Sequence, residues 1–445
     1  MMVALTSIGR ATLAASLLSF LLPFGSASAQ SSVPSPGRWL ITADFYGTQR
    51  YMPLELGGTS DKLTGKLGGM ALSGSVQNGH LHLTGRNESG DTAEVHGTLS
   101  QDKLTGNITQ TSPKDVTAHF SFTAEPVPPL PTAKPQRHEF TPTIFYRQFS
   151  PFNEPVLHIN PGDSVHTTTV DAGGNDEEDR KRVAGGNPET GPFYVNGAMP
   201  GDTLAVHIVR LRLNRDWAGS DDAIVESGMN SDMAIRMKGT GNAVRWRLDR
   251  EHNLAYSESP GEHLKQFAVP LRPMLGCVAT APGPGGAPPP TGDSGWYGGN
   301  MDFNGMTEGT TVYLPVSNPG ALLYVGDGHA AMGDGEITGN ALETSMDVEF
   351  RVDVIPHKRY SGIRLEDADS IMTMGLYGSL DDAFKEATSV MAEWLASDYK
   401  LSPSEIAQVL GTIAEYRVNE VADRNSGIVL RLPKARLANI SSPAL

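Results

Sequence analysis

Apolar and polar residues alternate along much of this chain with a period of two, which is the pattern of half-buried β-strands. Between Trp39 and about Glu125 the pattern recurs in short runs separated by turn residues, among them HLHLTGR, TAEVHGTLS and TAHFSFTAE. The sequence DKLTG occurs at residues 61–65 and again at residues 102–106, which indicates a repeated hairpin. We therefore expect a small all-β domain over residues 38–125.

A longer β-rich region follows, from residue 143 to residue 445. VLHINPGDSVHTTTVDA, DTLAVHIVRLRL and MDVEFRVDVI are typical of strands in a β-sandwich. Two late segments change to helical spacing, with apolar residues three and four apart. One helix should begin after Ser379 and the next after Ser402, since a serine hydroxyl can cap a helix N-terminus. The predicted fold is mainly β, with C-terminal helices.

Proline marks the connections between these regions. PVPPLPTAKPQRHEFTPT begins at Pro126 and predicts a stiff, extended linker over residues 126–142. The segment ATAPGPGGAPPPTGDSG, residues 279–295, is also rich in glycine and proline. Because it lies inside the second region, we interpret it as a long loop or a lid over a functional site.

Residues 1–29 have the features of a secretory signal peptide. Arg10 precedes a short apolar run, Leu13 to Phe24, and the small-residue pattern ASA at residues 27–29 is typical of a cleavage site. The run is too short to span a bilayer, for which about 20 apolar residues are needed. We expect a secreted or periplasmic protein that begins near Gln30 and has no membrane span after processing.

The net charge and the cysteine content exclude some classes of function. The formal net charge is −15 and no basic stripe is present, so nucleic acid is not an expected partner. The single cysteine, Cys277, has no second thiol in the chain, and we interpret it as a small buried residue rather than a nucleophile. Stability must therefore come from packing or from a bound metal ion.

The segment VGDGHAAMGDGE, residues 325–336, holds the densest set of chemically useful side chains. Asp327, His329, Asp334 and Glu336 are interleaved with four glycines, which allow sharp turns that bring side chains together. Because the segment follows the apolar run ALLYVG, we expect it at the end of a strand. A solvated Asp-Gly hairpin turn is the alternative, although such a turn seldom combines a histidine with three carboxylates.

Polar residues also follow other predicted strands. Asp171 ends the run TTTVD, and Asn300, Asp302 and Asn304 follow paired glycines in GWYGGNMDFNGM. For each of them alone, a role in forming a turn is the commoner explanation. Arg215 could hold a carboxylate, although we favour a surface ion pair for it.

Four segments in this order resemble signature blocks of the acetamidase/formamidase family. They are NPGDSVHTTTVDAGG, NPETGPFYVNGAMPGDTLAVHI, PMLGCVATAP and GGNMDFNGMTEGTTVYLPVSNPGALLYVGDGHAAMGDGEITGNALET. The resemblance extends from about Thr143 to the C-terminus and implies a jelly-roll-like β-sandwich core with small α+β elements. It also implies hydrolysis of small linear carboxamides, such as formamide or acetamide, to carboxylate and ammonia. Some relatives use zinc or another divalent ion.

The family blocks put functional weight on residues that suit this chemistry. Amide hydrolysis needs an activated water, a polarised carbonyl and a protonated leaving nitrogen. We expect Asp171, Asp302 and His329 to bind a divalent ion, with zinc preferred, and Glu336 and Asp327 to be catalytic. In this hypothesis Glu336 moves the proton. It could exchange roles with Asp302 or Asp334, and Glu343 falls in the same block.

Two alternatives to a linear-amide hydrolase stay open. The first is a non-catalytic β-sandwich whose oxygen-rich loops bind calcium and a ligand such as a glycan or a peptide. His329 favours zinc or a similar ion over calcium. The second is a hydrolase that opens lactams at the same site. The expected partner is a small-molecule amide, and the sequence leaves a homo-oligomer open.

Overall fold

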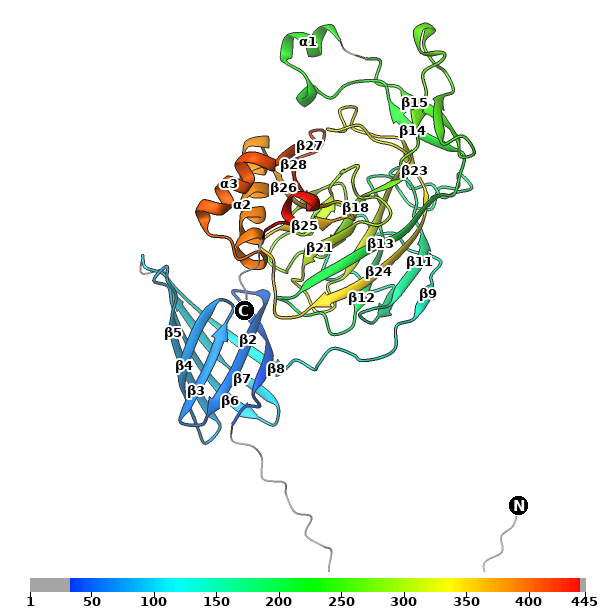
Figure 1. The fold of residues 1–445 in the computed structure, drawn as a ribbon. Helices are drawn as coiled ribbons and strands as arrows, with labels where there is room; N and C mark the ends of the chain where they lie inside the picture. The colour runs from blue at the N-terminus through cyan, green and yellow to red at the C-terminus, as the bar shows by residue number, and fades with distance from the viewer. Residues whose placement is uncertain (1–32, 115, 238, 441–445) are drawn as a thin grey trace, which may run out of the picture.

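The computed structural model describes residues 33–440 except residues 115 and 238, so the expected signal peptide lies outside the described residues. Figure 1 shows a small barrel, coloured blue to cyan, beside a larger domain that contains two sheets and a group of C-terminal helices. Strands greatly outnumber helices in both parts. The prediction of a mainly β fold is therefore confirmed.

Eight antiparallel strands form the N-terminal barrel, which closes because β1 pairs with both β2 and β8. The strands are β1 Gly37–Phe45, β2 Thr48–Thr59, β3 Lys62–Leu67, β4 Met70–Gln77, β5 His80–Arg86, β6 Thr92–Ser100, β7 Lys103–Thr111 and β8 Thr117–Pro126. Alternate residues point inward, so that Leu83 and Val95 are fully buried while His82 and His96 are exposed. The two DKLTG copies begin in the equivalent turns β2–β3 and β6–β7, and each continues into the strand that follows, β3 or β7.

The larger domain contains an 11-stranded and a 9-stranded sheet. The first has β10 Leu157–Ile159, β12 Thr190–Val195, β14 Trp217–Asp221, β15 Ala243–Asp249, β16 Leu254–Ser257, β17 Val269–Pro270, β18 Met274–Thr280, β19 Ser294–Gly295, β20 Gly298–Asn300, β22 Leu323–His329 and β23 Glu343–Thr344. The second has β9 Arg137–Glu139, β11 Ser164–Thr168, β13 Thr203–Leu213, β21 Thr311–Pro315, β24 Met346–Ile355, β25 Ile363–Glu366, β26 Ser370–Tyr377, β27 Glu415–Glu420 and β28 Ser426–Pro433.

One hydrophobic core joins these two sheets. Phe193 of β12 and Phe350 of β24, for example, meet edge to face with ring centroids 5.1 Å apart. This packing fits the expected sandwich. The jelly-roll connection implied by the family resemblance stays a prediction.

Two late helices are present as predicted, α2 (Leu380–Asp398) and α3 (Pro403–Ile413). The second was expected to continue past Ile413, but strand β27 follows there instead. The hydroxyls of Ser379 and Ser402 cap them as expected by accepting bonds from main-chain N–H groups of the first turn. The apolar face of α2 packs on β26 and β28. Two short helices, α1 (Ser231–Arg236) and α4 (Lys434–Leu437), complete the set. Within the described residues no helix has both the length and the apolar character needed to cross a membrane.

The segment expected as a linker, residues 126–142, is extended at first but then joins the larger domain. Its strand β9 pairs in parallel with β11 at the edge of the 9-stranded sheet. The main-chain N–H of Gln136 and the ring of His138 bond the buried carboxylate of Asp163, at 2.8 and 2.9 Å. The larger domain thus begins before residue 143. A buried ion pair between Arg38 and Asp202, 2.6 Å, also links it to the barrel.

Removing the barrel tests where the domain boundary lies. A chain that begins at residue 133 should fold cooperatively and unfold at a higher temperature than a chain that begins at residue 143. The shorter chain lacks β9 and leaves Asp163 without two of its donors, and each buried acceptor that loses its partner costs roughly 1–3 kcal/mol. Calorimetry of the two truncated proteins measures the difference. Equal unfolding temperatures would place β9 in the linker instead.

Candidate active site

Asp327 and His329 lie at the C-terminal end of strand β22, whose last residue is His329. Strand β22 pairs with β18 on one side and with β12 and β23 on the other, so it is central in its sheet. Because the two residues are two positions apart, their side chains share one face. The apolar pattern stops at Val325 because glycines alternate with Asp327 and His329 over the last four residues of the strand. The strand-end prediction is therefore confirmed, and the rest of the glycine-rich segment follows β22.

His329 is at the centre of a buried acidic cluster. Its Nε2 lies 3.2 Å from Asp327 Oδ2, 3.2 Å from Glu343 Oε1 and 3.9 Å from Asp302 Oδ1. The ligand atoms of Asp302, Asp327 and His329 all lie within 4.8 Å of one another, and so do those of His329, Glu336 and Glu343. All five side chains are buried. The structure thus brings together four of the five predicted site residues and adds Glu343.

Three of these acidic residues have a left-handed backbone. The φ angles of Asp302, Asp327 and Glu336 are 37°, 51° and 43°. Residues with a Cβ seldom adopt this region, and where they do, the surrounding structure holds them there, commonly at functional sites. The strained backbone directs three carboxyl groups toward one point.

Glycines in neighbouring strands make room for the carboxylates. A Cβ on Gly276 of β18 would lie 2.6 Å from Asp302 Oδ1 and would overlap Asp327 Oδ2. A Cβ on Gly326 would overlap the carboxylate of Glu189. The acidic side chains therefore fill the space in which ordinary strand residues would place their own side chains.

The glycine-rich turn that carries Glu336 is held by β27. The N–H of Gly335 donates to Asn419 O at 3.1 Å, and the N–H of Val421 donates to Gly335 O at 3.0 Å. Within the turn, the N–H of Ala341 donates to one carboxylate oxygen each of Glu336 (3.0 Å) and Glu343 (2.9 Å). These bonds fix the two carboxylates relative to the central strand.

A cavity of about 290 Å³ opens onto this cluster. Its walls include Asp327, Glu336, Glu343, Asn300 and Asp423. Pro290 and Gly292, from the segment predicted as a loop or lid, also line it. The Asn300 side chain donates to both Asp302 Oδ2 (2.6 Å) and Asp423 Oδ2 (2.8 Å), so it holds two acidic groups in place rather than merely forming a turn.

Burial and crowding change the acidity of the cluster. Burial, followed by the charges of Glu336 and Asp327, raises the pKa of Asp302 well above its usual range. Burial also raises the pKa of Glu336, although the neighbouring His329 opposes the change. For His329 itself burial lowers the pKa, but Glu343 and Asp327 raise it more. Burial therefore favours the protonated forms of Asp302 and Glu336, whereas a bound cation would favour their charged forms.

Several buried polar atoms of the cluster have no hydrogen-bond partner among the described residues. They are Asp302 Oδ1, Asp327 Oδ1, Glu343 Oε2 and both ring nitrogens of His329. A buried polar group without a partner costs about 1–3 kcal/mol of stability, so several such atoms in one place indicate a bound ion or water. One imidazole with several carboxylates is a ligand set that suits zinc and similar divalent ions. The residues present therefore fit a divalent metal ion.

Asp171, predicted as a metal ligand, lies outside this cluster. Its Oδ2 forms a buried ion pair with Arg215 Nη2 at 2.8 Å, and its Oδ1 accepts a bond from the N–H of Asn175. Arg215 also donates to Glu343 O at 3.2 Å, so the pair supports the strand that carries Glu343. Both expectations change: Asp171 is neutralised by an arginine, and the Arg215 ion pair is buried rather than on the surface.

Asp334 also lies outside the cluster, although it belongs to the same glycine-rich segment. It pairs with Arg417 of β27 and accepts a bond from the Asn304 side chain at 2.8 Å. The pair fastens the turn to the 9-stranded sheet. We therefore interpret Asp334 as a residue that positions the turn.

Sequence reasoning missed Glu189 and Asp423. Glu189 lies on the far side of Gly326, is fully buried, and has no hydrogen-bond partner for either oxygen among the described residues apart from the Cys277 thiol. In the sequence, Glu189 falls in a segment that is typical of turns. Asp423 lies at the end of a predicted helix, and no distinguishing pattern surrounds it. Cys277 is buried as expected, and burial together with Glu189 raises the pKa of its thiol well above the usual value.

Replacing Gly276 with alanine tests the crowding of the carboxylates. The added Cβ should displace Asp327 and Asp302, lower stability by about 1–3 kcal/mol and weaken divalent-ion binding. Gly219→Ala in β14 of the same sheet is the matched control, since nothing lies within 4 Å of its Cβ position. Calorimetry and metal analysis of both variants provide the readouts. Similar behaviour of the two variants would show that the carboxylates are free to move.

Glu420, next to Asp423, provides a test of buried acidity. Burial, with a contribution from Asp423, raises the pKa of Glu420 to about 8. The folded state therefore retains its proton above the unfolded pKa near 4.5, and stability falls by about 1.4 kcal/mol per pH unit until pH passes 8. Glu420→Gln removes this loss, so its unfolding temperature should exceed that of the parent increasingly from pH 5 to 8 and then level off. A pH-independent difference would contradict a raised pKa.

Comparison with known proteins agrees with this geometry. The profile of the Acetamidase/Formamidase family matches residues 290–373, which include Asp302, Asp327, His329, Glu336 and Glu343. A Schizosaccharomyces pombe protein provisionally named as a formamidase is 51% identical over 41 residues, 9% of this chain and 10% of that protein. The chain thus spans about a tenth of the length of that curated relative.

Solved structures extend the likeness to the whole larger domain. A predicted acetamidase/formamidase from Thermoanaerobacter tengcongensis is 28% identical, covers 69% of this chain and 99% of its own, and has a TM-score of 0.59. An acetamidase from Bacillus halodurans is 28% identical, covers 68% and 99%, and also has a TM-score of 0.59. The family profile, the short curated match and the solved structures all show that this chain is similar to proteins of the acetamidase/formamidase family.

Proposed function

We propose that the larger domain hydrolyses the C–N bond of small linear carboxamides, of the formamide or acetamide type, to a carboxylate and ammonia. The buried cluster of His329 with four carboxylates beside a small cavity is the observation that carries this proposal. The names of the similar solved proteins, acetamidase and acetamidase/formamidase, support the same class of substrate.

The size of the cavity favours a small substrate. Its volume of about 290 Å³ is at the lower limit of ligand pockets, which span roughly 300–1,000 Å³. A water molecule occupies about 30 Å³ in the liquid, so the cavity has room for an amide of a few heavy atoms together with the attacking water. A large acyl group or a peptide chain would not fit without movement of the segment at residues 279–295.

Asp302, Asp327 and His329 are the residues that we propose to hold a divalent ion, with zinc preferred. Asp327 thereby takes the place that the sequence suggested for Asp171, because its Oδ2 lies 3.2 Å from His329 Nε2. A bound ion of this kind would lower the pKa of its water toward about 7 and would polarise a carbonyl oxygen. The imidazole disfavours calcium, which prefers oxygen ligands.

Glu336 is suited to move the proton. It lines the cavity, and one of its oxygens accepts a bond from the N–H of Ala341. It would take the proton from the attacking water and deliver it to the amide nitrogen, which must be protonated before it leaves as ammonia. Glu343 Oε1 lies 3.2 Å from the same His329 Nε2, so Glu343 would be a further candidate ligand of the ion.

Two substitutions separate binding of the ion from transfer of the proton. His329→Ala should lose the ion and the activity together. Glu336→Gln should keep the ion and the fold, while kcat for acetamide falls by about 10²–10⁴-fold, the usual contribution of acid–base catalysis. Ammonia release and metal analysis are measured on the same preparations.

Glu258→Gln is the control for these substitutions, since Glu258 is an acidic residue that pairs with Arg245 outside the cluster, and this variant should retain both ion and turnover. Loss of the ion in Glu336→Gln would make Glu336 a ligand instead of the proton carrier. Parental rates in both test variants would place the chemistry elsewhere. Calcium binding by the parent without any ammonia release would favour a non-catalytic binding domain.

A further inference from the structure

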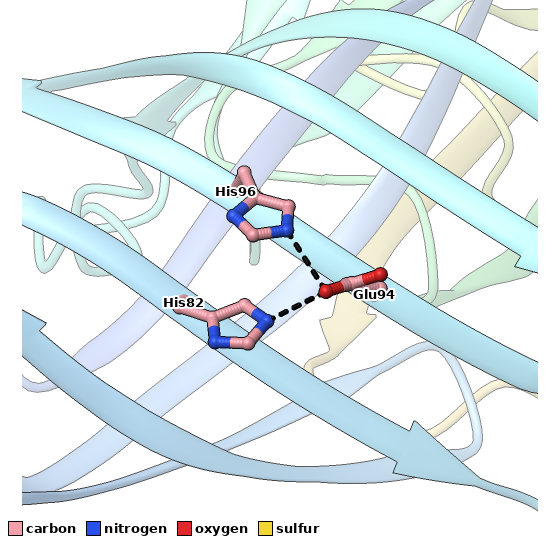
Figure 2. Close-up of side chains that lie close together, drawn as sticks. All are labelled: His82, Glu94 and His96. Atoms are coloured by element: carbon pink, nitrogen blue, oxygen red, sulfur yellow. Dashed lines mark hydrogen bonds and ion pairs between the residues drawn. The ribbon is translucent and has the colours of Figure 1, made fainter.

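A second group of metal-ligating side chains lies on the barrel, in a different domain from the acidic cluster. His82 of β5 and His96 of β6 are direct cross-strand partners, and Glu94 lies two residues before His96 on the same strand. All three point to the outer face, where they are exposed. Figure 2 shows both imidazole rings turned toward the Glu94 carboxylate.

The three side chains converge on a single point. His82 Nε2 lies 2.8 Å and His96 Nε2 lies 2.9 Å from the same oxygen, Glu94 Oε1. The two rings are stacked, with centroids 4.3 Å apart and an interplanar angle of 12°. The ligand atoms of the three residues all lie within 4.8 Å of one another. The rings thus present corresponding nitrogens to one shared position.

The strand pairing fixes this arrangement. The backbones of β5 and β6 are hydrogen-bonded neighbours, and the inward side chains on either side of the group, Leu81, Leu83 and Val95, are buried in the barrel core. Sites that are built on paired strands are more rigid than sites on loops. Only side-chain torsions need to change for the three ligand atoms to move apart slightly.

The spacing matches what a small divalent ion requires. Zinc binds imidazole nitrogen at about 2.0–2.1 Å and carboxylate oxygen at about 2.0–2.2 Å in tetrahedral geometry. Two ligand atoms on such an ion are separated by roughly 3.4 Å, which follows from these bond lengths and the tetrahedral angle. The present separations of 2.8 and 2.9 Å need to open by only about half an ångström.

The donor set selects the class of ion. Two imidazole nitrogens and one carboxylate suit zinc, nickel, copper and cobalt, whereas calcium and magnesium prefer oxygen ligands alone. Neighbouring outward residues on the adjoining strands, such as Ser75 and Asn107, are small and neutral and leave the position accessible. Three protein ligands leave a fourth position for water or for a donor from another molecule.

We propose that His82, Glu94 and His96 form a surface site for a divalent transition-metal ion of the zinc type, with both Nε2 atoms and a Glu94 oxygen as ligands. The ion would connect β5 to β6 on the outer face of the barrel and would keep at least one open coordination position. This site is independent of the amide chemistry proposed for the larger domain.

Zinc titration of the full chain in the His329→Ala background tests this site, because that substitution removes the ligand central to the other cluster. The His329→Ala chain should bind one zinc ion per molecule in equilibrium dialysis. Adding His82→Ala or His96→Ala should weaken this binding at least tenfold. Circular dichroism confirms that each variant keeps its β fold.

His80→Ala and His119→Ala are matched controls, since both histidines also lie on the outer face of the barrel but outside the group. Each should bind zinc as the parent does. A copper-loaded sample should show two nitrogen ligands by electron paramagnetic resonance, and His96→Ala should remove one. Equal zinc affinity with and without His82 and His96, or equal loss in the controls, would overturn the proposal. Amide hydrolysis should be unchanged by His82→Ala in the chain that retains His329.

Discussion

Burial of several negative groups around one imidazole is the constraint on which the larger domain depends. A carboxylate removed from water is strongly destabilised unless a partner compensates its charge. Here Asp302, Asp327, Glu336 and Glu343 surround His329 in the middle of a sheet, and one histidine cannot neutralise four acids. The cluster is stable only with bound protons or with a cation. This requirement links its acidity, its unpaired atoms and its fit to a divalent ion.

The surrounding structure is arranged to accept this group. Strands β18 and β22 place Gly276 and Gly326 where side chains would collide with the acids, and three of the acidic residues keep a left-handed backbone. Strand β27, far along the chain, holds the turn that carries Glu336. Each of these features lowers the stability of the fold by itself, and together they orient the carboxylates before any substrate arrives.

In the barrel, the ligating side chains are on the surface instead of in the interior. Its interior is filled by apolar side chains, and its ligating residues His82, Glu94 and His96 are on the outside, in contact with solvent. Exposed groups lose little hydration when they bind an ion. The buried cluster of the larger domain loses its hydration during folding, and this loss destabilises the folded state. The ion pair of Arg38 with Asp202 joins the two domains without connecting either group of ligands to the other.

The sequence by itself determined the elements of this protein and the segment that carries its chemistry. Alternation with a period of two identifies strands and their inward faces, and Ser379 and Ser402 mark the helix starts, because these signals act between residues close in the chain. The glycine-rich segment indicated Asp327, His329 and Glu336 as candidate site residues, because they too are close to one another in the chain.

Only the tertiary structure decided which distant residues join them. It brings in Glu343 and Glu189, assigns Asp171 to Arg215 instead, and places His82 opposite His96. The physical reason is that periodicity tells which face of a strand a side chain occupies, whereas its neighbours depend on strand order and register. Those are set by packing between segments that can be more than a hundred residues apart, such as β12 and β22.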